Sequence, residues 1–127
     1  HPRAQVGSAV LMGPEELMGE CVLMGGHGGV CGGANLSPRM YVDMYDAAVA
    51  GDLRQVNVLQ QRMLRLSSLV YSVGIAPSSY LTGLKAAMSM IGLCEARLSE
   101  PLTALPADRR ATLARHLTDL GMNVVNP

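Results

Sequence analysis

The segment that most restricts the fold is Gly25–Asn35, which reads Gly-Gly-His-Gly-Gly-Val-Cys-Gly-Gly-Ala-Asn. So many glycines in one place imply positive φ angles or a close approach of the backbone to other groups. Residues 29–33 can form one short strand. A helix is then expected at Ser37-Pro38, because serine is a preferred capping residue and proline suits the first helical position. The segment therefore predicts a strand, a turn and a helix.

A similar strand and helix are predicted upstream. Val6–Met12 is short, apolar and rich in β-forming residues, which indicates a buried strand that stops at Gly13-Pro14. Proline suits the first turn of the next helix, and the carboxylates of Glu15 and Glu16 favour its positive end. That helix continues to Gly25-Gly26 with apolar residues at helical spacing, namely Leu17, Cys21 and Met24.

The remaining sequence predicts helices, because apolar residues recur at steps of three and four. After Ser37 the expected stripe is Tyr41, Met44 or Tyr45, and Ala48, ending at Gly51. The helix after Asp52 has Val56, Leu59, Met63, Leu66, Val70 and Val73 on one face. The helix after residues 74–78 has Leu81, Leu84, Met88 and Ile91, and the helix from Pro106 has Leu113, Leu117 and Leu120. The tail 123–127 is expected to fray.

Composition excludes several classes of partner. Ten basic and ten acidic side chains leave no net field toward nucleic acid or an anionic membrane, and four tyrosines without Phe or Trp make a poor base-stacking platform. The apolar runs fall short of the roughly 20 residues of a membrane span. Three cysteines without a pairing pattern fit a reducing cytoplasm. Because a strand follows almost directly on His1-Pro2, we expect further sequence upstream.

The order of these motifs resembles the end of the dihydrodipicolinate synthase / N-acetylneuraminate lyase family. In that family the seventh strand ends in glycine and two polar or acidic residues, as at Gly13–Glu15, and the eighth reads Gly-Gly-x-Gly-Val-Ile-Ser-x-x-Ala-Asn, as at Gly25–Asn35. Ala48–Asp52 resembles the turn that follows helix eight, and Leu84–Ala87 resembles a later Val-Lys-Ala-Ala stretch.

The resemblance implies an α/β fold, the C-terminal part of a (β/α)₈ barrel. Residues 1–50 would form the last two βα units and residues 51–127 a helical appendage. It also implies a cytoplasmic, tetrameric lyase or aldolase in which a lysine forms a Schiff base with pyruvate or a related 2-oxo acid, without a cofactor or metal. That lysine, a tyrosine relay and a Thr-Thr turn are expected in the upstream half of the barrel. Lys85, the only lysine here, aligns with the appendage. This chain alone is therefore expected to be inactive.

Three residues are expected in the substrate pocket and none in catalysis. The resemblance places Gly13 at the end of strand seven, Val30 beside the bound 2-oxo acid, and Cys31 where the family commonly has serine. Two departures leave the second substrate open. Pro14-Glu15 replaces the Asp-Asp pair of true dihydrodipicolinate synthases, and Gly32-Gly33 replaces a β-branched pair.

Other interpretations of the same residues stay open. The glycine-rich segment could cradle a phosphate, although it lacks the established phosphate-binding motifs. Cys21, His27 and Cys31 could ligate zinc, or His27 could activate Cys31 as a nucleophile, but a fourth ligand and an orienting carboxylate are missing. Glu15 and Glu16 could serve as acid and base. In a different class, the chain would be a non-catalytic helical interaction or oligomerisation domain.

Overall fold

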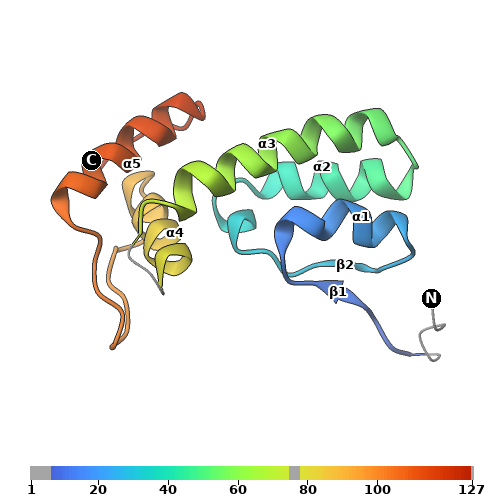
Figure 1. Cartoon of the computed structure of the whole chain (residues 1–127), viewed down its shortest axis with the longest axis horizontal. Helices are drawn as coiled ribbons and strands as arrows, with labels where there is room; N and C mark the ends of the chain where they lie inside the picture. The colour runs from blue at the N-terminus through green and yellow to red at the C-terminus, as the bar shows by residue number, and fades with distance from the viewer. Residues whose placement is uncertain (1–6, 75–77, 127) are drawn as a thin grey trace. The chain divides into compact units, whose positions relative to one another are not determined.

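The computed structural model describes residues 7–74 and 78–126, which form two very short strands and a series of helices (Figure 1). The elements are β1 (Leu11–Met12), the 3-10 helix η1 (Glu15–Leu17), α1 (Met18–Leu23), β2 (Gly28–Gly29), the 3-10 helix η2 (Gly32–Asn35), α2 (Pro38–Val49), α3 (Leu53–Tyr71), α4 (Ser79–Met90) and α5 (Ala107–Asp119). In the described part of the chain, the helices lack the combination of length and apolar character that crossing a membrane requires.

The chain divides into two compact units, an N-terminal unit (His1–Leu64) and a C-terminal unit (Arg65–Pro127). The division falls inside α3, so this helix contributes to both units. The sequence-based boundary between residues 50 and 51 separates barrel strands from a helical appendage, which is a different division, and it stays a prediction.

β1 and β2 pair in parallel, with Leu11 opposite Gly28 and Met12 opposite Gly29. Two further backbone hydrogen bonds extend the pairing. The His27 amide donates to the Val10 carbonyl at 2.8 Å, and the Val30 amide donates to the Met12 carbonyl at 2.9 Å. Helix α1 connects the two strands, as parallel pairing requires. The result is one βαβ unit.

Both strands differ from the sequence-based prediction. The first, expected over Val6–Met12, is Leu11–Met12 within the described residues; Val6 lies outside them. Leu11 is 53% exposed, so this strand is not buried. The second, expected over 29–33, is Gly28–Gly29 instead, and Gly32–Asn35 turns into η2. Among the described residues, β1 and β2 each have only the other as a neighbouring strand. A pair of strands on its own leaves much of its surface exposed.

The core of the N-terminal unit lies where α1, α2 and the first part of α3 meet. Its buried cluster is Met18, Tyr41, Met44, Ala47, Leu59 and Met63. Gly19 allows α1 to lie close to α2 and α3, because a Cβ at this position would lie 2.9 Å from Met44 Sδ and 3.3 Å from Val56 Cγ1. Any larger residue at 19 would displace one of these side chains.

The predicted faces of α2 and α3 are largely confirmed. Met44 is fully buried whereas Tyr45 is exposed, which decides between the two candidates on α2. Along and just after α3 the buried residues are Leu59, Met63, Leu66, Val70 and Val73, while Val56 is half-buried. Pro38 begins α2 as expected, but Ser37 makes no capping hydrogen bond with its side chain.

The C-terminal unit packs the end of α3 against α4 and α5. On α5 Leu113 and Leu117 are fully buried as predicted, and Leu120 is half-buried. The buried face of α4 was predicted only in part, because Leu84 is buried as expected but Leu81 is exposed and Met88 and Ile91 are only half-buried. The buried residues on α4 are Thr82, Gly83, Leu84, Ala86, Ala87 and Met90. A Cβ at residue 83 would overlap the Val70 carbonyl oxygen, so small residues let α4 approach α3 closely.

The tail after α5 is held against the end of α4. The amides of Val125 and Asn126 donate to the Met90 carbonyl at 2.8 and 3.0 Å, and the Asn126 side chain donates to the Ser89 carbonyl at 3.3 Å. Carbonyls in the last turn of a helix lack intrahelical partners, so the tail satisfies them. The expected fraying is therefore wrong for Val125 and Asn126, and Pro127 lies outside the described residues.

Candidate functional site

Gly13, Val30 and Cys31 come together at the carboxyl ends of the two strands. Gly13 directly follows β1, and Val30 and Cys31 follow β2. The Val30 amide donates to the Met12 carbonyl, and Cys31 Sγ lies 4.0 Å from the same oxygen. Carboxyl ends of parallel strands are where α/β folds usually bind their ligands. The assignment of these three residues to substrate binding stays a prediction.

The space in front of these strand ends is open in this chain. Val30 is 72% exposed, and among the described residues other than the chain neighbours of Gly13, no heavy atom lies within 4 Å of the point where Gly13 would place a Cβ. An apolar side chain with this exposure can be covered by a ligand or by further protein.

Glu15 is the residue of this region whose role the sequence did not indicate. It begins η1, and it is only 3% exposed. Its Oε2 accepts a hydrogen bond of 2.8 Å from the Gly33 amide, which lies 18 residues further along the chain. Gly33 is the second residue of η2, and Cys31 at the N-cap gives no side-chain cap. Glu15 therefore satisfies an amide that a helix start leaves unpaired.

Cys31 is held in a partly desolvated position between the strands and α1. Its Sγ lies 3.8 Å from Met18 Sδ. Burial, together with the negative charges of Glu15 and Glu16, raises the pKa of the Cys31 thiol to about 11. At neutral pH the group is the protonated thiol, which is a poor nucleophile.

The hypothesis that His27 activates Cys31 is not supported by the geometry. His27 Nδ1 accepts a hydrogen bond of 3.0 Å from the Val10 amide. Because an amide can only donate, Nδ1 holds the lone pair and the ring proton lies on Nε2. His27 is exposed in its loop, as the sequence indicated, and it extends the strand pairing.

The zinc and phosphate hypotheses gain no support either. Among the described residues, no group of three His, Cys, Asp or Glu side chains is placed to hold a metal ion. Cys21 is buried in α1. The amides of Leu36 and Ser37, which could have faced a phosphate, donate instead to the Gly33 carbonyl at 2.9 and 3.0 Å.

A pocket of about 370 Å³ lies beside Cys31 in the N-terminal unit. Its lining is mostly apolar and consists of Leu11, Met18, His27, Gly28, Gly29, Cys31, Ala34, Pro38, Tyr41, Val42 and Tyr45. A Cβ at Gly29 would lie 2.8 Å from Cys31 Sγ, so glycine is needed there to leave room for the thiol. Gly13 and Val30 are not among the lining residues.

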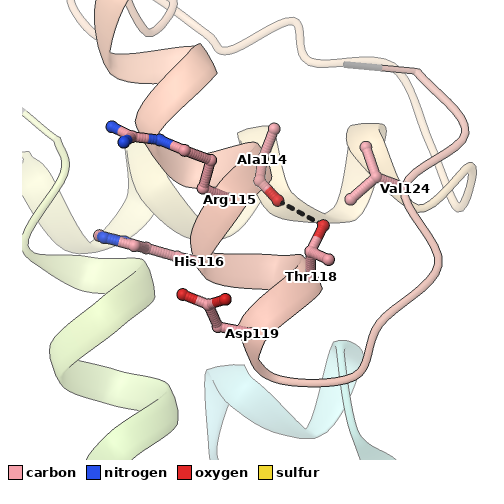
Figure 2. A pocket seen from close by; sticks show the side chains of 6 residues that line it. All are labelled: Ala114, Arg115, His116, Thr118, Asp119 and Val124. Atoms are coloured by element: carbon pink, nitrogen blue, oxygen red, sulfur yellow. Dashed lines mark hydrogen bonds between the residues drawn. The ribbon is translucent and has the colours of Figure 1, made fainter.

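A second, polar hollow of about 660 Å³ lies on α5 of the C-terminal unit (Figure 2). It is lined by Ala114, Arg115, His116, Thr118, Asp119 and Val124. Two of its polar groups are used by the fold. His116 Nδ1 lies 2.8 Å from the Leu69 carbonyl and must carry the proton, and the Thr118 hydroxyl donates to the Ala114 carbonyl at 3.0 Å.

The described part of the chain is mostly helical, with two short parallel strands that a helix connects. Comparison with known proteins makes the assignment specific. The model of the dihydrodipicolinate synthetase family matches residues 3–120, and the chain therefore belongs to this family.

Known relatives agree with the family assignment. The 4-hydroxy-tetrahydrodipicolinate synthase of Leptothrix cholodnii is 32% identical over 120 residues, covering 94% of this chain and 39% of the relative. The dihydrodipicolinate synthase structure from Bacteroides thetaiotaomicron is 41% identical, with a TM-score of 0.85 over 87% of this chain and 37% of that one.

A third comparison supports the fold alone. A prophage protein of the dihydrodipicolinic acid synthase family from E. coli K12, solved in complex with pyruvate, has a TM-score of 0.76 at 23% identity, over 91% of this chain and 38% of that one. The chain therefore spans less than two fifths of the length of these relatives and matches part of a barrel structure.

Proposed function

We propose that this chain is the C-terminal part of a Schiff-base lyase or aldolase that acts on pyruvate or a related 2-oxo acid. Residues 1–50 supply the last two strands of a (β/α)₈ barrel, and residues 51–127 supply a helical appendage. The observation that carries the proposal is the open, parallel pair of strand ends with Gly13, Val30 and Cys31 at its rim, in a chain of this family.

In this reaction a lysine amine attacks the carbonyl carbon of the 2-oxo acid, and water leaves as the imine forms. Lys85 lies half-buried on α4 in the C-terminal unit, whereas the candidate pocket residues lie in the N-terminal unit. We therefore assign the reacting lysine to the upstream half of the barrel. The pyruvate complex of the E. coli K12 protein supports a ligand of this class.

The role of this chain is to supply one wall of the pocket. Val30 gives apolar contact, Gly13 leaves space, and Cys31 presents a neutral thiol where a negative charge would repel a carboxylate substrate. The exposed Leu11, Val42 and Val49 support a further covering by the upstream strands and helices. The assembled enzyme is proposed to be a cytoplasmic homo-oligomer.

The experiment mixes this chain with the part of the Leptothrix cholodnii enzyme that precedes the matched region. Pyruvate and borohydride are added, and intact masses are measured under denaturing conditions. We expect a reduced pyruvate adduct on the added fragment only when this chain is present, and none on this chain alone. An adduct on Lys85, or equal labelling of the fragment without this chain, would overturn the proposal.

A pair of substitutions tests the pocket wall. Val30→Asp places a charge at the strand ends and is expected to reduce labelling at least about tenfold, because a carboxylate there repels the substrate and costs desolvation. Val58→Asp is the matched control, since Val58 is also exposed but lies on α3. Equal labelling with the two variants would remove Val30 from the site.

A further inference from the structure

We propose that Glu15 is a positioning residue, whose buried carboxylate holds the turn from Cys31 to Gly33 against the end of the first strand. The use of that turn as a pocket wall rests on the proposed function, whereas the positioning itself is a property of this chain. Glu15 thereby acts through the turn and not on a substrate.

The Cys31 side chain packs against the core cluster of the N-terminal unit, whereas Gly32 and Gly33 have no side chains with which to pack. Gly32 and Gly33 follow Cys31, and Gly28 and Gly29 precede it, so the backbone on both sides has access to many conformations. Among the described residues, three interactions of this segment with the β1 side are the basis of the proposal. They are the bond from the Val30 amide to Met12, the contact of Cys31 Sγ with Met12, and the bond from the Gly33 amide to Glu15.

The Glu15 interaction is the one made by a charged group. A carboxylate that is 3% exposed loses most of its hydration, which is tolerated only when protein donors replace the water. The 2.8 Å length of the bond is typical of a charge-assisted hydrogen bond. The Gly33 amide is the second amide of η2, and in most helices such an amide donates to the side chain of the N-cap residue, here Cys31. Here the cap comes from the other strand end.

Glu16 provides a matched control within the same helical turn. It has the same charge and lies one residue later, but it is half-buried and lines a different pocket with Glu20, Leu23 and Asn57. Loss of Glu16 removes a nearby negative charge and leaves the bond to Gly33 in place. The two residues therefore separate a positioning effect from a general effect of charge.

The test compares Glu15→Ala, Glu15→Gln and Glu16→Ala in this chain. Amide hydrogen exchange is measured by NMR at Gly33 and along α2, and the alkylation rate of Cys31 is followed by peptide mass spectrometry. For Glu15→Ala we expect exchange at Gly33 to accelerate on the order of tenfold, as for loss of a hydrogen bond to a charged group. Alkylation of Cys31 should accelerate in parallel, while α2 stays protected.

Glu15→Gln keeps an acceptor oxygen and is expected to restore the Gly33 protection. Glu16→Ala should leave Gly33 protection unchanged. The proposal is overturned if Glu15→Ala leaves Gly33 exchange unaltered, or if Glu16→Ala accelerates it equally. If Glu15→Ala unfolds α2 as well, the Glu15→Gln variant distinguishes a positioning role from a general role in stability. A folded, protected Gln variant upholds the positioning role, and an unfolded one shows that Glu15 supports the whole unit instead.

These measurements use no 2-oxo acid. Failure of the adduct experiment would therefore leave the positioning role standing, and a normal Gly33 amide in Glu15→Ala would leave the lyase proposal standing.

Discussion

The two units differ in how well they cover their apolar side chains. Among the described residues, twelve of the sixteen exposed large apolar side chains belong to the N-terminal unit. Both units nevertheless enclose a core, because Met44 and Met63 are fully buried in the N-terminal unit, as are Met90, Leu113 and Leu117 in the C-terminal unit. Exposed apolar side chains can be covered by a ligand or by further protein when they lie together, and the N-terminal unit offers more of them than the C-terminal unit. The comparison makes the N-terminal unit the one for which the proposed function needs a further covering.

The polar interactions differ in the same way. In the C-terminal unit, Arg109 and the tail amides bind carbonyls at helix ends, at Val73, Gly74 and Met90. In the N-terminal unit, Glu15 binds an amide next to the strand ends. These polar groups of the C-terminal unit complete its helices, whereas the N-terminal unit has one interaction at its candidate site, from Glu15, and another at a helix start, from Asp52 to the Gln55 amide.

The largest expected effect tests whether the C-terminal unit has a core of its own. Leu117→Ala removes a fully buried side chain and should lower the free energy of unfolding by about 2–5 kcal/mol. Leu81→Ala, at an exposed position on α4, should change it by less than about 0.5 kcal/mol. Urea unfolding followed by circular dichroism measures both. Equal effects would break the comparison, because the C-terminal unit would then have no closed core.

A smaller effect is expected from the side chain that binds the end of α3. The Arg109 guanidinium donates to the carbonyls of Val73 at 3.0 Å and Gly74 at 2.7 Å. Arg109→Ala should lower the free energy of unfolding by about 1–2 kcal/mol, since two acceptors lose a charged donor.

Arg110→Ala serves as the control for this substitution, because Arg110 makes a longer contact, 3.5 Å to the Asn126 carbonyl. We expect it to be within about 0.5 kcal/mol of the unchanged chain. Thermal and urea unfolding of both variants measure which substitution lowers the free energy of unfolding more. A control as destabilising as Arg109→Ala would mean that loss of charge, and not the bonds at the helix end, causes the effect.

Sequence periodicity predicted the helices well, because their buried faces repeat every three to four residues. The stripe from Leu59 to Val73 and the pair Leu113 and Leu117 are buried as predicted. It succeeded only in part on α4, where Leu84 is buried as predicted but Leu81 is exposed. There, Gly83 and its small neighbours decide the packing, and only the position of α3 reveals this.

The strand ends and Glu15 show what local patterns cannot predict. The extent of β1 and β2 depends on which backbone groups find partners, and the glycines of Gly25–Asn35 permit several choices. Glu15 reads locally as a helix-start acid, but its partner at Gly33 is 18 residues away. The meeting of Gly13, Val30 and Cys31 was predicted from the family resemblance, and their function remains a prediction.

The smallest expected effect concerns pH and tests how deeply the site in the N-terminal unit is buried. The pKa of the Cys31 thiol is raised to about 11 in the folded chain, chiefly by burial, with Glu15 and Glu16 adding to the shift. A raised pKa means that folding favours the protonated thiol. Its contribution to stability is therefore complete below the ordinary thiol pKa of about 8.5 and is lost as pH rises through about 11.

The measurement is the rate of Cys31 alkylation against pH, read on the Cys31 peptide. We expect its midpoint near 11, and Glu15→Gln or Glu16→Gln should lower it, since each removes a negative charge that disfavours the thiolate. Cys31→Ser should flatten the alkaline decline of stability slightly, because the thiol is only partly buried. If the midpoint of the alkylation rate lies near the pKa of a free thiol, the Cys31 side chain is exposed to solvent. The N-terminal unit would then present an open strand end without the partly closed site that Glu15 and Met18 form around the sulfur.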